Sequence, residues 1–166
     1  MTLFAEPLRM EASSLLERLR DRRVKLATAE SCTGGLIAAL LTEVPGSSDV
    51  IERGFVTYSN DAKMQMLGVD PGLIVAHGAV SREVALAMAA GAITHSPADV
   101  SVAVTGMAGP GGGSADKPVG LVHIAALRRG LSPIHREFRF GNAGRSEIRL
   151  QSVAAALKLI RRVLDA

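Results

Sequence analysis

A short run of residues with reactive side chains, ESCTGGL at positions 30–36, is the first candidate for a catalytic or ligand-binding site. It holds a carboxylate, two hydroxyls, the only cysteine of the chain and two glycines, between an apolar run and an apolar helical pattern. Free backbone N–H groups at a helix start attract anions, and paired glycines let a ligand approach the backbone closely. The run therefore predicts either an anion-binding turn or an ordinary helix cap by a hydroxyl. Its ligand-contacting candidates are Glu30, Ser31, Thr33 and Gly34.

A second segment, PGSSDVIERGFVTYSNDAK at 45–63, combines serines with a tyrosine and a lysine. Lys63 can act as a general base for a serine only if it is neutral, which requires burial or nearby cations to lower its pKa. Tyr58, the only tyrosine, can relay a proton or orient that lysine. Helix capping by Ser47 and Ser48, and a solvated Lys63, are the plain alternatives.

A third segment, VTGMAGPGGGSADKPVG at 104–120, is a glycine-rich loop after a Val-rich strand. Such loops expose backbone N–H groups that can bind phosphate or carboxylate, although a surface loop is the simpler interpretation. Arg145, before the last helix, is a further anion-binding candidate. The binding candidates of this region are Thr105, Gly106, Gly109, Gly111, Gly112 and Arg145.

Other nucleophile and metal patterns are weak. Cys32 has no activating partner in the sequence, so a buried small side chain is the expectation. The four histidines are scattered, with neither an H-E-x-x-H motif nor a cysteine partner, so we expect no metal site.

Hydrophobic periodicity indicates elements that would bring these segments together. It predicts helices over 8–22, 34–44, 60–69, 81–94 and 143–166, a helix start at 70–78, and a short helix or turn over 47–54. It predicts strands over 24–30, 54–59, 99–106, 119–128 and 133–140, the last two as a hairpin. The alternation predicts one domain over residues 1–166, an α/β fold with three α/β/α layers around a mixed sheet of about five strands. Ligands of such sheets bind beyond the carboxyl ends of the strands.

Composition and charge limit the classes of binding partner that we expect for this chain. The net charge is only +3, and the basic clusters at 18–23, 128–129 and 161–162 lack interleaved aromatic residues, so no nucleic-acid partner is expected. No apolar stretch reaches the roughly 18 residues of a membrane span, so no membrane partner is expected. A single cysteine and a poor signal-peptide pattern favour the cytoplasm. Ala-rich aliphatic helices lead us to expect a homo-oligomer.

Three stretches together resemble the C-terminal domain of the CinA family, which also occurs alone as nicotinamide-nucleotide amidohydrolase. They are TAESCTGGLIAALLTEVPGSSDVIERGFVTYSNDAKMQMLGV, HGAVSREVALAMAAGA and AVTGMAGPGGGSADKPVGLVHIA, in order over most of the chain. The resemblance implies hydrolysis of nicotinamide mononucleotide to nicotinic acid mononucleotide and ammonia, without metal or cofactor. Longer relatives carry an N-terminal molybdopterin-binding-like domain, for which this chain is too short.

The resemblance also implies a Ser–Lys amidase, with Lys63 as base, Tyr58 as its helper and a serine as nucleophile. We favour Ser48, because the turn from Ser31 to Gly35 is better suited to binding an anion or to making an oxyanion hole. Ser31 is the second candidate. Thr105, the glycine loop and Arg145 would then bind the small-molecule nucleotide substrate.

Two other functions stay open. One is a non-catalytic module that binds a phosphorylated ligand, associated with competence or recombination. The other is an amidohydrolase that depends on Cys32.

Overall fold

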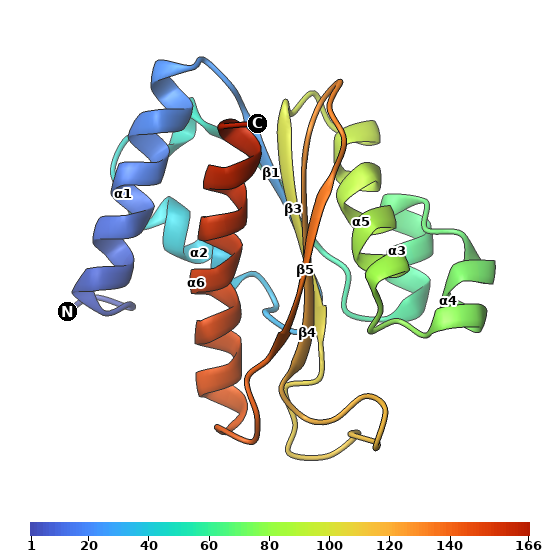
Figure 1. Ribbon diagram of the computed structural model, residues 1–166. Coiled ribbons are helices and arrows are strands. Elements are labelled where there is room, and N and C mark those ends of the chain that lie inside the picture. Colours follow the sequence, from blue (N-terminus) through green and yellow to red (C-terminus); the bar gives the residue numbers. More distant parts are fainter.

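A five-stranded mixed sheet forms the centre of the protein, and helices cover both of its faces (Figure 1). The computed structural model describes all residues from 1 to 166. The strands are β1 (Leu26–Glu30), β2 (Ile51–Val56), β3 (Val100–Gly106), β4 (Leu121–Arg128) and β5 (Ile134–Arg139), in the spatial order β2-β1-β3-β4-β5. This architecture confirms the predicted three-layer α/β fold.

The sheet changes from parallel to antiparallel across its width. β1 pairs in parallel with both β2 and β3, whereas β4 and β5 form the predicted antiparallel hairpin. Every residue of β1, and all of β3 except its last, is buried. Burial along the whole strand is typical of parallel strands that helices cover on both faces.

One layer contains α1 (Glu6–Asp21), α2 (Leu36–Thr42) and α6 (Arg145–Leu164), with a large core of Leu, Ile and Val against the sheet. The other contains α3 (Asn60–Leu67), α4 (Pro71–His77) and α5 (Arg82–Thr94), with a smaller and alanine-rich core. Small side chains bring α5 close to the sheet. No helix is both long enough and apolar enough to cross a membrane.

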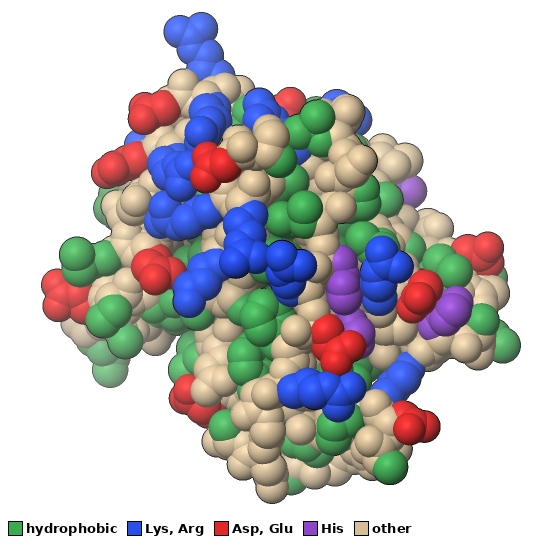
Figure 2. Space-filling view, in the orientation of Figure 1, with side chains coloured by type: hydrophobic (Ala, Val, Ile, Leu, Met, Phe, Trp, Pro, Cys, Tyr) green, Lys and Arg blue, Asp and Glu red, His purple; other side chains and the backbone are tan.

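Basic side chains gather near the C-terminal ends of α1 and α6, and Figure 2 shows them with acidic residues among them. Arg18 of α1 and Arg22, the residue directly after this helix, both pair with Asp165, just beyond the end of α6. Cations at these positions complement the negative end of each helix dipole. The pairing joins the two helices at their C-terminal ends.

The region from 47 to 59 differs from the sequence prediction. A single 3-10 turn, η1 (Ser47–Asp49), precedes β2, and the strand begins at Ile51 rather than at Gly54. The physical reason is pairing with β1, because Leu26 to Glu30 hold Ile51 to Val56 in register. Residues 57–59, predicted as strand, form the connection to α3 instead.

α3 packs closely on α5 at Gly91. A Cβ atom at this position would overlap the backbone carbonyl of Leu67, the last residue of α3. The glycine therefore sets how near α3, which carries Lys63, lies to the rest of the protein.

We expect Gly91→Ala to lower the free energy of unfolding by about 1–3 kcal/mol, because the added methyl group must push α3 away. In a helix where nothing packs against the glycine, the same change raises the free energy of unfolding by up to about 1 kcal/mol, because alanine favours the helix. The two cases differ in sign, so chemical denaturation distinguishes them. A Gly91→Ala protein as stable as the parent would contradict the close packing.

Candidate active site

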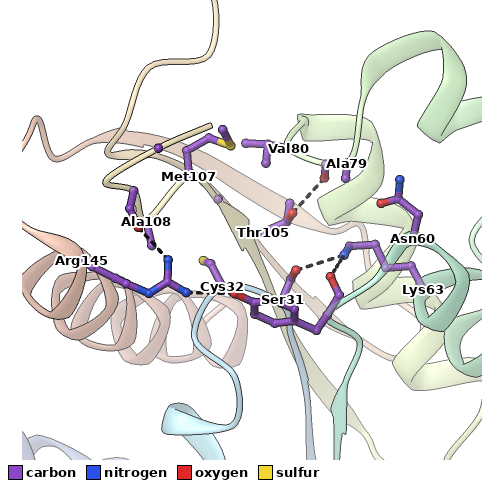
Figure 3. Close-up of a pocket in the computed structure, with 14 residues that line it drawn as sticks. Ser31, Cys32, Asn60, Lys63, Ala79, Val80, Thr105, Met107, Ala108 and Arg145 are labelled. Atoms are coloured by element: carbon purple, nitrogen blue, oxygen red, sulfur yellow. Dashed lines mark hydrogen bonds between the residues drawn. The ribbon is translucent and has the colours of Figure 1, made fainter. Parts of the chain in front are cut away.

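A pocket of about 260 Å³ lies beyond the carboxyl ends of β1, β2 and β3, where the sequence predicted a ligand site. All three chemistry-bearing segments, the α4–α5 connection and the start of α6 contribute to it (Figure 3). Its lining residues with polar side chains are Ser31, Cys32, Tyr58, Asn60, Lys63, Thr105 and Arg145.

The amine of Lys63 lies against the hydroxyl of Ser31. The distance from Lys63 Nζ to Ser31 Oγ is 3.0 Å, and the same nitrogen is 2.9 Å from the backbone oxygen of Thr57 and 3.3 Å from that of Tyr58. Only 1% of Lys63 is exposed, and no carboxylate pairs with it. The lysine is thus not the solvated helix residue of the plain alternative.

Burial lowers the pKa of Lys63 below its ordinary value of 10.5, because the charged form loses its hydration. The surroundings suit the neutral amine, which has two N–H donors and one lone pair. The two donors can serve the backbone oxygens of Thr57 and Tyr58, which leaves the lone pair to accept a hydrogen bond from the Ser31 hydroxyl. A neutral amine and a hydroxyl at this distance meet the geometric requirement for a general base and its nucleophile.

Cys32 lies in the same pocket, but burial favours the unreactive form of its thiol, whereas it favours the basic form of Lys63. Its side chain is nearly buried, and burial raises the pKa of the thiol to about 11. At pH 8 a thiol of that pKa is ionised in only about one molecule in a thousand. The structure therefore does not support the Cys32-dependent alternative.

Arg145 closes the side of the pocket opposite Lys63 (Figure 3). Its guanidinium donates to the backbone oxygen of Gly109 at 2.7 Å and to the Tyr58 hydroxyl at 2.9 Å. The phenol of Tyr58 is thus engaged with Arg145, and only the backbone of Tyr58 contacts Lys63. The predicted role of this tyrosine as a helper of the lysine is not supported by its side-chain contacts.

Thr105 and Asn60 line the remaining wall. The Thr105 hydroxyl donates to the backbone oxygen of Ala79 at 2.8 Å and so holds the α4–α5 connection over the pocket. Asn60, the first residue of α3, is exposed and forms no side-chain hydrogen bond within the protein. Asn60 belongs to the second chemistry-bearing segment of the sequence, but the sequence analysis gave it no role in the site.

Ser48, the favoured nucleophile, does not lie in the pocket. It is exposed on η1, before β2, whereas Tyr58 and Lys63 follow β2. A six-residue strand of about 3.3 Å per residue separates the two ends by roughly 20 Å. Of the two candidate serines, the structure brings only Ser31 to Lys63.

The turn after β1 is not an open anion site either. The buried carboxylate of Glu30 accepts hydrogen bonds from the backbone N–H groups of Ile37 and Ala38 at 2.9 and 3.1 Å. It therefore occupies the start of α2 itself, where an acidic group is favourable. Thr33 is also fully buried. Three more predicted binding residues, Thr33, Gly34 and Gly112, are likewise outside the pocket lining, whereas Gly106, Gly109 and Gly111 belong to it.

No group of three or more His, Cys, Asp or Glu side chains is arranged to hold a metal ion. His123 and His135, on the two strands of the β4–β5 hairpin, lie against each other with 3.0 Å between Nδ1 of His123 and Nε2 of His135. The pair lies on β4 and β5, away from the pocket lining.

The fold and the pocket define a three-layer α/β protein with a buried lysine and a serine at the carboxyl ends of its parallel strands. The family model described as the CinA C-terminal domain matches residues 9–164. The chain therefore belongs to the CinA C-terminal domain family, as the sequence resemblance predicted.

Individual relatives agree with this assignment. A "CinA-like protein" of Mycobacterium marinum is 54% identical over 89% of this chain, and a "putative competence-damage inducible protein" of Moorella thermoacetica is 50% identical over 89%. The chain spans about a third of the length of these curated relatives, 34% and 35%.

Solved structures match nearly the whole chain. The competence/damage inducible protein CihA of Agrobacterium tumefaciens superimposes with a TM-score of 0.97 at 51% identity, covering 100% of both chains. A CinA superfamily protein of Escherichia coli gives 0.90 at 34% identity, covering 98% of this chain and 94% of that one.

We expect alkylation of Cys32 by iodoacetamide at pH 8 to be at least about 100-fold slower in the folded protein than in urea, because burial keeps the thiol protonated and shielded. Mass spectrometry of the intact protein over time measures both rates on the same sample. Equal rates in the two states would show that the thiol is accessible and ionised.

Proposed function

We propose that this domain hydrolyses the carboxamide of nicotinamide mononucleotide, giving nicotinic acid mononucleotide and ammonia. The observation that carries the proposal is the buried amine of Lys63, 3.0 Å from the Ser31 hydroxyl in a pocket that also presents a guanidinium. The family resemblance supplies the substrate.

In the first half of the reaction, neutral Lys63 takes the proton of Ser31 as its oxygen attacks the carboxamide carbon. The resulting tetrahedral adduct collapses when the leaving nitrogen receives that proton back, so ammonia departs and a Ser31 ester remains. A water molecule, deprotonated by the same amine, then attacks the ester; the bond from the acyl carbon to Ser31 Oγ breaks, that oxygen takes the proton from Lys63, and the carboxylic acid leaves. Lys63 is neutral again at the end of each half-reaction.

The negative oxygen of the tetrahedral adduct needs hydrogen-bond donors. The backbone N–H of Cys32, directly after the proposed nucleophile, donates to no backbone oxygen, nor do those of Ala108 and Gly109 in the glycine loop. These free donors lie in residues that line the same pocket as Ser31. They support an oxyanion site made by the pocket itself rather than by the start of α2.

Charge also favours this substrate. The nicotinamide ring of the mononucleotide is cationic, so a protonated lysine beside the carboxamide would repel it, whereas a neutral amine does not. At the other side of the pocket, Arg145 offers a planar guanidinium of the kind that binds phosphate. Asn60, with an amide free of internal partners, is suited to the ribose hydroxyls or the carboxamide.

A change of Ser31 to alanine is expected to lower ammonia release from nicotinamide mononucleotide by at least about 10³-fold, because the nucleophile is lost. Ser48→Ala is the matched control, and we expect it to keep the parental rate because that serine lies at the opposite end of β2. A chelator should leave the rate of the parent protein unchanged.

The same assay separates the alternatives. Loss of activity in Ser48→Ala, with Ser31→Ala active, would reverse the assignment of the nucleophile. Binding of nicotinamide mononucleotide without any turnover by the parent protein would favour the non-catalytic binding module.

We expect kcat/KM to rise with pH and to level off above the pKa of Lys63, because only the neutral amine accepts the serine proton. Burial lowers that pKa, so the plateau begins below the ordinary lysine value of 10.5. Lys63→Arg keeps a cation that stays protonated throughout, so its activity should be at least about 10³-fold lower at every pH. A flat profile, or an active Lys63→Arg protein, would remove the proposed base.

A further inference from the structure

Arg149 on α6 reaches across to the turn that carries Ser31. Its Nε donates to the backbone oxygen of Cys32 at 3.0 Å, and its terminal nitrogen donates to that of Thr33 at 3.2 Å. Arg149 is half-buried and does not line the pocket. It therefore acts on the two residues after the candidate nucleophile without facing the substrate.

The turn has few other constraints at this point. The backbone oxygen of Cys32 has no other donor in the protein, since the neighbouring bonds run from Gly34 to Ser31 and from Leu36 to Thr33. The left-handed conformation of Gly34, with φ of 56°, keeps the chain from entering the helix before α2 begins. The guanidinium thus takes the place of the regular hydrogen bonds that this segment lacks.

Ser31 is held from both sides as a result. Its own N–H donates to the backbone oxygen of Val104 in β3 at 3.0 Å, and Arg149 holds the two peptide groups that follow Cys32. Because peptide groups are planar, fixing the oxygens of Cys32 and Thr33 also fixes the direction of the turn. The N–H of Cys32, a proposed oxyanion donor, belongs to the same turn.

α6 presents two arginines one turn apart, and they divide the site between them. Arg145 holds the glycine loop and the Tyr58 hydroxyl, whereas Arg149 holds the turn that follows the candidate nucleophile Ser31. Ile148, between them, is fully buried against the sheet and anchors this end of the helix. One rigid element therefore sets the spacing of two pocket walls that are more than 70 residues apart in the sequence.

We infer that Arg149 is a positioning residue that holds Ser31 and the Cys32 N–H in the geometry needed for attack, an assignment that rests on the proposed Ser31–Lys63 chemistry. A misplacement of about 1 Å in reacting groups can cost roughly 100-fold in rate. Since the guanidinium does not reach the substrate, the loss falls on kcat rather than on KM.

The test compares Arg149→Met with Arg161→Met. Arg161 lies on the same helix and donates to a backbone oxygen, that of Glu11 in α1, at 3.0 Å, so it loses the same kind of contact away from the site. We expect Arg149→Met to lower kcat for nicotinamide mononucleotide by about 10- to 100-fold with KM changed less than about threefold. Arg161→Met should keep both constants. Equal kcat values in the two variants would overturn the inference.

A second readout does not depend on the substrate. A fluorophosphonate probe labels activated serines, so its rate of addition to Ser31 reports the nucleophile directly, with Ser31→Ala as the blank. We expect Arg149→Met to slow labelling by about tenfold or more, and Arg149→Lys to recover part of the rate because a lysine can donate to one of the two oxygens. Labelling as fast in Arg149→Met as in the parent overturns the inference.

The outcomes separate this inference from the function. A parent protein that is labelled at Ser31 but releases no ammonia fails as an amidohydrolase of this substrate, and the labelling rates still decide the role of Arg149. If Arg149→Met does not fold, Arg149→Lys takes its place, with an expected kcat at least about fivefold below that of the parent. Parental kcat and labelling in Arg149→Lys would then overturn the inference.

Discussion

The burial of one lysine next to one serine is the constraint on which the rest of the site depends. A charged ammonium loses its hydration in this position, and no carboxylate compensates for it. The neutral amine can donate to the backbone oxygens of Thr57 and Tyr58, and its lone pair is then left for the hydroxyl of Ser31, whose oxygen lies 3.0 Å away. Burial also raises the pKa of the neighbouring Cys32 thiol, so the environment that favours a neutral lysine keeps the cysteine protonated.

Elements distant in the sequence maintain that environment. Gly91 lets α3, which carries Lys63, pack closely on α5. Glu30, the last residue of β1, accepts a hydrogen bond from the backbone of Ile37 at the start of α2 and so fixes the turn between the two elements. From the opposite layer, α6 holds the glycine loop through Arg145 and the turn after Ser31 through Arg149. The pocket is therefore built by both helical layers, and the sheet between them supplies the strand ends at which they meet (Figure 1).

Much of the fold could be predicted because its signals are local. The alternation of apolar patterns gave the order of helices and strands, and the Val-rich run at 99–106 is the central β3. The start of β2 could not be predicted, because its extent depends on pairing with β1 rather than on its own residues. The convergence of the three segments followed from the rule that ligands bind beyond the carboxyl ends of parallel strands.

The roles within the site were harder to predict, because they depend on which side chains meet. Ser31 and Ser48 are equivalent as residue types, and only the three-dimensional path of β2 places one beside Lys63 and the other at the far end. The sequence suggested that the Glu30 carboxylate contacts a ligand. In the structure it accepts a hydrogen bond from the backbone of Ile37, seven residues later, and no local pattern predicts that bond. Arg149 gave no signal at all, since an arginine inside a long amphipathic helix is usually a surface residue.

The protonation state of Lys63 is the most direct test of this account. Titration of the free protein by NMR, with lysine labelled at the carbon next to the amine and Lys63→Arg used to assign the signal, measures its pKa without any substrate. The account predicts a midpoint clearly below 10.5, the value of an ordinary lysine. A midpoint at or above that value would mean that the amine is charged at neutral pH and cannot take the proton of Ser31.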